Sequence, residues 1–161
     1  MRKKKNLILS FLITLIVVSF SLVLLFQFYF VPKSFHVRWT WEGQAWGYVN
    51  QEVTISSNGD IRCIDKVNDK QSQGKLSSTE LAGLKKAVDG TKFYSLGNTY
   101  FQGCCDCADY TITVTEGNKS KTLQVLRRCG GAGVENVPEI PAGLYQFIDK
   151  LEDFYSRRLE W

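Results

Sequence analysis

The feature that most constrains this chain is an uncharged stretch from Leu7 to Val31, which follows basic residues at positions 2–5. As a helix it would be about 37 Å long, more than the roughly 30 Å of a bilayer's hydrocarbon core. Basic residues before such a span tend to stay in the cytoplasm. The pattern predicts four parts: a cytoplasmic tail (1–6), a transmembrane helix (7–31), a linker (32–34) and an extracytoplasmic domain (35–161).

A cleaved signal peptide is the alternative interpretation of this stretch. Its apolar core would be about 7–15 residues long, followed by small residues at a cleavage site. Here the bulky run at 26–30 occupies that place, and no Ala-x-Ala-like tripeptide follows it. The sequence therefore favours a retained anchor, a contact with the lipid bilayer through residues 7–31, and a location in the cell membrane.

The formal charge of +4 comes from the N-terminal cluster. Four of the 20 Lys and Arg residues lie at positions 2–5, which leaves 16 against 16 Asp and Glu. Nucleic-acid binding depends on a basic surface, so this neutral domain is not expected to bind nucleic acid. The single histidine, His36, argues against a multi-histidine metal site, and we expect no cofactor.

Hydrophobic alternation and turn signals predict the elements of the domain. Apolar and polar residues alternate from Phe35 to Trp41, which is typical of a half-buried strand. Asn58-Gly59 predicts a hairpin, and the spacing of Ser77 and Glu80 predicts a capping box at the start of a helix. The expected order is strands at 35–41, 48–56 and 60–67, a helix to Gly90, strands at 110–115 and 121–127, and a helix after Pro141. This order predicts an α+β fold: an antiparallel sheet of about five strands with two helices on one face.

All five cysteines follow the uncharged stretch: Cys63, Cys104, Cys105, Cys107 and Cys129. In an oxidising compartment the default is disulfide bonding, and an odd number leaves one thiol over. A hairpin centred on 117–118 would place Cys107 opposite Arg128, so Cys129 is expected to pair within 104–107. Two alternatives stay open. Cys104 and Cys107 have the spacing of a redox motif, and with Cys129 and Cys63 they supply enough thiolates for zinc.

Aromatic residues near the start of the domain suggest another kind of site. Trp39, Trp41, Trp46 and Tyr48 could form a platform for a glycan or small ligand, although alternate aromatic residues in a strand more often belong to a core. No nucleophile, base and metal combination forms a convincing catalytic set. The sequence therefore predicts a binding domain rather than an enzyme.

From about Trp41 to Phe154 the chain resembles the emfourin-type family of small bacterial α+β domains. The resemblance is carried, in order, by Gly43 and Gly47, Asn58-Gly59, Leu76-Ser77 with Glu80-Leu81 and Leu84, Phe93-Tyr94-Ser95-Leu96, Tyr100 before Cys104-Cys105-Asp106, Tyr110-Thr111-Ile112-Thr113-Val114, and Pro138. Some members of that family inhibit thermolysin-like metalloproteases. The resemblance thus implies a protein partner, an extracytoplasmic protease in the case of an inhibitor.

A disulfide-pinned loop from Asn98 to Asp109 is the predicted binding surface, because a rigid loop loses less entropy on binding. The candidate contact residues within it are Asn98, Tyr100, Phe101 and Gln102. A thiol, redox or metal module at Cys104–Cys107 and a glycan or small-ligand sensor are the alternative functions.

Overall fold

The computed structural model describes residues 13–22, 34–44, 48–103, 108–128 and 137–159. The chain divides into two compact units, 1–33 and 34–161. In the first unit, residues 13–22 form a helix with exposed side chains, which is about 15 Å long at 1.5 Å per residue. No helix among the described residues is long and apolar enough to cross a membrane. The prediction of a transmembrane helix over 7–31 is corrected accordingly. The location of the second unit stays a prediction.

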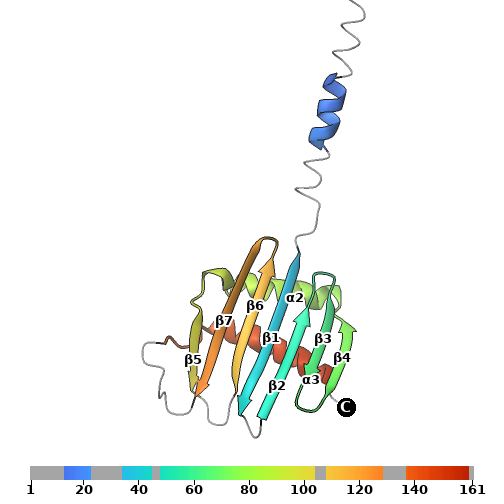
Figure 1. Ribbon diagram of the computed structural model, residues 1–161. Helices are drawn as coiled ribbons and strands as arrows, with labels where there is room; N and C mark the ends of the chain where they lie inside the picture. Colours follow the sequence, from blue (N-terminus) through green and yellow to red (C-terminus); the bar gives the residue numbers. More distant parts are fainter. Residues whose placement is uncertain (1–12, 23–33, 45–47, 104–107, 129–136, 160–161) are drawn as a thin grey trace, which may run out of the picture. The chain divides into compact units, whose positions relative to one another are not determined.

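The second unit contains a seven-stranded mixed sheet in the order β4-β3-β2-β1-β6-β7-β5 (Figure 1). The strands are β1 (Phe35–Gln44), β2 (Tyr48–Ile55), β3 (Asp60–Asp65), β4 (Lys70–Lys75), β5 (Thr99–Gly103), β6 (Asp109–Glu116) and β7 (Lys119–Arg128). Neighbouring strands are antiparallel except β5, which is parallel to β7.

The predicted antiparallel sheet of about five strands is therefore wrong, while the α+β class holds. Two strands account for the difference. β4 is exposed at five of its six positions and has no apolar alternation. β5 is short, and it belongs to the sheet because it pairs with β7, which is distant in the sequence. The hairpin prediction for β6 and β7 is confirmed, because Tyr110 faces Val125 in the register expected for a turn centred on 117–118.

Helices α2 (Ser78–Gly90) and α3 (Ala142–Leu159) both lie behind the sheet in Figure 1, with the short 3-10 helix η1 (Phe93–Ser95) following α2. The predicted capping box at the start of α2 is confirmed. The Ser77 backbone N–H donates to Glu80 Oε2 at 2.8 Å, and the Glu80 N–H donates to Ser77 Oγ at 3.2 Å.

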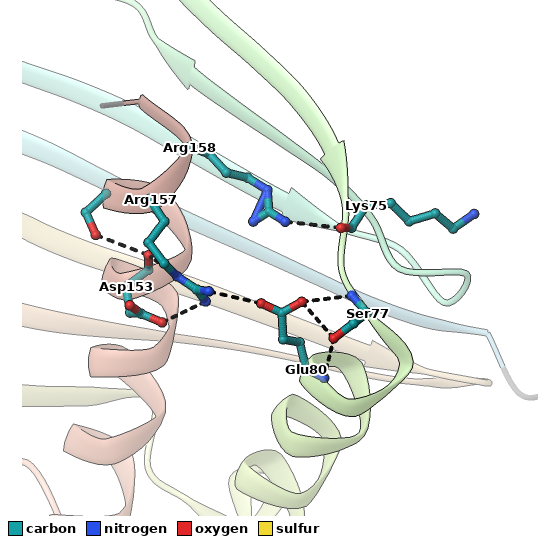
Figure 2. Close-up of polar contacts among 7 residues, drawn as sticks. Lys75, Ser77, Glu80, Asp153, Arg157 and Arg158 are labelled. Atoms are coloured by element: carbon teal, nitrogen blue, oxygen red, sulfur yellow. Dashed lines mark hydrogen bonds and ion pairs between the residues drawn. The ribbon is translucent and has the colours of Figure 1, made fainter. Parts of the chain in front are cut away.

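Two arginines near the end of α3 connect the helical layer to its neighbours (Figure 2). Arg157 forms ion pairs with Glu80 Oε1 at 3.2 Å and Asp153 Oδ2 at 2.8 Å. Arg158 Nη2 donates to the backbone carbonyl of Lys75 at 3.1 Å. These contacts tie α3 to the start of α2 and to the end of β4.

The core fills the space between the sheet and the two helices. Trp39 at the centre of β1 is fully buried, beside its strand neighbours Val53 and Ile112. The largest fully buried side chains of the core are Trp39, Phe93, Phe147, Ile55, Ile61, Leu84, Ile112, Leu123, Leu144, Leu151, Val37 and Val53. Because successive side chains of a strand point to opposite faces, the same strands present a second set of residues away from the helices.

Candidate functional site

The sheet face opposite the helices, called the open face below, is the candidate site. In β1 the exposed His36 and Arg38 alternate with the buried Phe35, Val37 and Trp39. The strand register places the outward side chains in two central rows: Gln71, Ile64, Glu52, Thr40, Thr111, Gln124 and Thr99 in one, and Gln73, Arg62, Thr54, Arg38, Thr113 and Thr122 in the other.

Hydrogen bonds between neighbouring strands order the side chains of this face. The hydroxyls of Thr113 and Thr122 lie 2.8 Å apart, and a second hydroxyl pair, Thr115 and Ser120, lies at 3.0 Å. Such cross-strand pairs each stabilise a sheet by roughly 0.2–1 kcal/mol. The hydroxyls are thereby held in place by contacts within the sheet.

Arg38 is neutralised by a fork of two contacts to Glu52. Its Nε lies 2.9 Å from Oε1 and its Nη2 donates to Oε2 at 3.1 Å, while Lys66 approaches Oε2 at 3.3 Å. Burial raises the pKa of Glu52, but the hydrogen bonds and charges of Arg38 and Lys66 outweigh it and lower the pKa below its usual value. Glu52 is therefore ionised at neutral pH and fixes the Arg38 guanidinium.

The composition of the central rows differs from that of an ordinary solvated surface. Among the described residues, neither row contains a lysine. Lys66 and Lys75 lie at the margin of the open face. At the β5 end, Phe101 pairs with Leu126, and both are half-buried. Protein interfaces are depleted in lysine and enriched in arginine and aromatic residues, and the open face follows that trend.

A hollow of about 570 Å³ lies at the β1–β4 end of this face. Its polar lining comprises His36, Thr54, Ser56, Asp60, Arg62 and Gln73. Arg62 Nη2 donates to Gln71 Oε1 at 3.0 Å, and no carboxylate among the described residues pairs with this guanidinium. Asp60, in contrast, is engaged by Asn58 Nδ2 at 2.7 Å and by Lys75 at 3.5 Å.

The predicted contact residues do not lie on one loop surface, because residues 99–103 form β5. Tyr100 is a core residue, and its hydroxyl accepts a hydrogen bond from the Gly97 N–H at 2.7 Å. Asn98 is exposed, and its side chain accepts a hydrogen bond from Lys121. Phe101 and Gln102 are half-buried. By alternation, Phe101 belongs to the open face, whereas Gln102 points to the other side with Tyr100.

Of the five cysteines predicted to form disulfides or to bind zinc, only Cys63 lies among the described residues. Cys63 is a free thiol that is fully buried in β3, so it is not a disulfide partner, and burial raises its pKa. Cys104, Cys105, Cys107 and Cys129 lie outside the described residues. No group of three or more metal-binding side chains occurs among the residues that were described. Pairing, redox and zinc chemistry at 104–107 stay predictions.

Two of the four aromatic residues suggested as a glycan platform, Trp39 and Trp41, pack in the core or against it. Trp39 is fully buried, and Trp41 packs partly buried against the core with its ring 6.5 Å from that of Trp39. Tyr48 is exposed, and Trp46 lies outside the described residues. The two tryptophans therefore contribute to stability, and this arrangement gives no support to a glycan platform.

A polar cluster at the end of the covered face was not expected from the sequence. The Tyr110 hydroxyl contacts both Glu152 of α3 and Arg127 of β7. Burial and the neighbouring Glu152 carboxylate raise the pKa of Tyr110 far above its usual value. A group that stays protonated in this way acts here as a link between sheet and helix.

No family model matches the chain, and no curated protein matches it. The emfourin-type resemblance accordingly stays a prediction.

Proposed function

We propose that the domain binds another protein through the open face of its sheet. The observation that carries the proposal is the pair of central rows, which are uncovered by helices, contain no lysine among the described residues and are ordered by their own hydrogen bonds. A surface whose side chains are already ordered loses little further entropy when a partner binds.

The size of the open face suits a protein partner. Seven strands at about 4.8 Å spacing give a width of about 30 Å, and strands of eight residues are about 26 Å long. The resulting area of roughly 780 Å² is similar to the ~800 Å² that each partner contributes to a standard interface. One partner could therefore cover the face from β4 to β5.

Two positions are the expected energetic anchors. Interface energy concentrates in a few aromatic and arginine side chains at the centre of packed patches. Phe101 beside Leu126 offers an apolar anchor at one end, and Arg62 in the hollow offers a charged one at the other. The threonine rows between them supply polar contacts and flatness.

Photo-crosslinking tests this proposal in cells. A photoreactive amino acid that replaces Thr113 lies on the open face. The same photoreactive amino acid in place of the exposed Gln146 of α3 lies on the opposite side of the domain. We expect a discrete crosslinked protein from position 113 and none of that species from position 146. Equal products from both positions, or products from 146 alone, would overturn the proposal.

The resemblance proposes a thermolysin-like metalloprotease as the partner, with the domain acting as an inhibitor outside the cytoplasm. The full chain should then slow such a protease at stoichiometric concentration without being cleaved. Phe101→Asp should weaken the inhibition, whereas Gln146→Asp should not. Rapid digestion of the domain would show that it is not an inhibitor of that protease. The proposal that the open face binds a protein would then be decided by the crosslinking experiment.

A further inference from the structure

The two edges of the sheet differ in whether they are covered. At the β5 edge, the Phe101 N–H donates to the Pro138 carbonyl at 2.8 Å, and Phe101 forms a bridge with Glu139. At the other edge, β4 pairs with β3, and no described segment pairs with its outer side. An uncovered edge strand presents free backbone groups to which another chain can pair.

The hydrogen-bond pattern identifies which backbone groups of β4 point outward. The Leu76 N–H donates to the Gly59 carbonyl at 2.8 Å, which makes the Gly59–Leu76 position a hydrogen-bonded one. Alternation along an antiparallel pair then turns the backbone groups of Gln71, Gln73 and Lys75 away from β3. The Lys75 carbonyl accepts a hydrogen bond from Arg158 at 3.1 Å, which agrees with this assignment because the carbonyl then points away from β3. Among the described residues, nothing hydrogen-bonds to the outward N–H and C=O groups of Gln71 and Gln73.

The side chains beside these backbone groups belong to the open face. Gln73 is adjacent to Arg62 in the strand register, and both line the hollow of about 570 Å³. In a newly added antiparallel strand, the residue hydrogen-bonded to Gln73 would place its own side chain on the same face as Gln73. That side chain would therefore lie at the rim of the hollow, within reach of the long Arg62 side chain.

The charges around this edge favour an acidic occupant. The Arg62 guanidinium has one hydrogen bond, to an amide oxygen, and no carboxylate partner among the described residues. Lys75 at the end of β4 has its side chain on the open face, whereas Lys70 pairs with the buried Asp65 and by alternation belongs to the other face. The nearby Asp60 is already engaged by Lys75 and Asn58. Lysines at an edge normally discourage strand pairing, but the same charges attract a strand that carries carboxylates.

We infer that the outer edge of β4 takes up an extended, acidic segment of a partner protein as an additional antiparallel strand, with a carboxylate directed to Arg62. This inference goes beyond the proposed function, because it concerns the edge of the sheet and the backbone of the partner. Main-chain hydrogen bonds would supply affinity, and Arg62 would supply selectivity for acidic side chains.

A designed peptide tests the inference with the full chain. The probe is a blocked eight-residue peptide of alternating Glu and Thr, labelled for fluorescence anisotropy. In an antiparallel added strand, the residues whose N–H groups face β4 place their side chains on the same face as Gln73. Glu side chains on the open face therefore require Glu N–H groups that face β4. N-methylation of the Glu residues should therefore weaken binding at least tenfold, whereas N-methylation of the Thr residues should change it less than threefold.

Variants of the protein provide the matched controls. Gln73→Pro removes an outward N–H from an edge strand, where proline is tolerated, and should weaken binding at least tenfold. Arg62→Gln should weaken it several-fold, while Lys150→Gln on α3 should not. Circular dichroism confirms that each variant is folded.

The inference is overturned if both N-methylated peptides bind equally or if an alternating Lys–Thr peptide binds as tightly as the acidic one. Pairing of two β4 edges into a dimer that excludes the peptide would also overturn it. In each case the crosslinking result at Thr113 would still decide the open-face proposal separately.

Discussion

The two faces of the sheet are built from the same strands but differ in burial: one packs against the helices, and the other is the proposed binding surface. On the covered face, Trp39 and Ile112 are completely excluded from solvent and pack under the helices. Their sequence neighbours Arg38, just before Trp39, and Thr113, just after Ile112, lie side by side on the open face. Residues of the core and residues of the proposed binding surface are therefore direct neighbours in the sequence, and substitutions at adjacent positions should affect stability and binding separately.

The largest effect is expected on the covered face. Trp39→Ala removes a fully buried ring from the centre of the sheet, and such truncations destabilise proteins by about 3–5 kcal/mol. Urea unfolding monitored by circular dichroism measures this change. The matched variant Thr113→Ala on the open face should change the free energy of unfolding by no more than about 1 kcal/mol. Similar losses at the two positions would contradict the division between the faces.

A smaller loss of stability is expected from a substitution at the N-terminal cap of α2. Ser77→Ala removes the side-chain oxygen that caps α2 and contacts Glu80 (Figure 2), and the loss of such a cap costs about 1 kcal/mol. The neighbouring Ser78→Ala, an exposed position in the first turn, is the control and should be close to neutral. Equal unfolding midpoints for the two variants would show that the cap contributes nothing measurable.

The third prediction concerns acid pH. Burial raises the pKa of Asp65, but hydrogen bonds from Asn68 and the Val67 N–H outweigh it and lower the pKa below its usual value. The folded pKa is thus below the unfolded value of about 3.9. The contribution of Asp65 is therefore present above about pH 4 and is lost as the pH falls through the folded pKa.

Asp65→Asn tests that contribution. The variant should lose less stability than the wild type between pH 5 and pH 2, as measured by thermal unfolding at each pH. An unchanged slope would mean that the carboxylate does not stabilise the turn between β3 and β4.

The smallest effect is expected for Thr113→Val. It deletes the hydroxyl pair with Thr122 but keeps the β-branched shape that strands favour, so the stability should change by less than about 0.5 kcal/mol. The same variant should weaken partner binding if the hydroxyl rows take part in recognition. A variant that unfolds markedly more easily would show that the open face also carries stability.

Local patterns in the sequence predicted part of this fold correctly. The alternation in β1, the capping box at Ser77 and the register around residues 117–118 each depend on a few neighbouring residues. β4 was missed because its sequence, KQSQGK, lacks apolar alternation, and its identity as a strand comes from pairing with β3. β5 was missed because its partner β7 is distant in sequence.

The candidate site could be predicted less well. Tyr100 looked like an exposed aromatic anchor, but the β5–β7 pairing turns it into the core. The same pairing brings Phe101 beside Leu126 on the open face. The outward residues of β1 form an alternating polar set in the sequence, yet their position beside the outward residues of β6 depends on the sheet order, which no local pattern contains.

Hydroxyl-radical footprinting of the complex with the crosslinked partner tests the central claim most directly. Phe101 and Leu126 report on the open face, and Tyr145 of α3, 38% exposed, reports on the opposite side. Binding through the open face predicts that oxidation of Phe101 and Leu126 slows several-fold while oxidation of Tyr145 is unchanged. Protection of Tyr145 with unchanged oxidation of Phe101 and Leu126 would contradict the account.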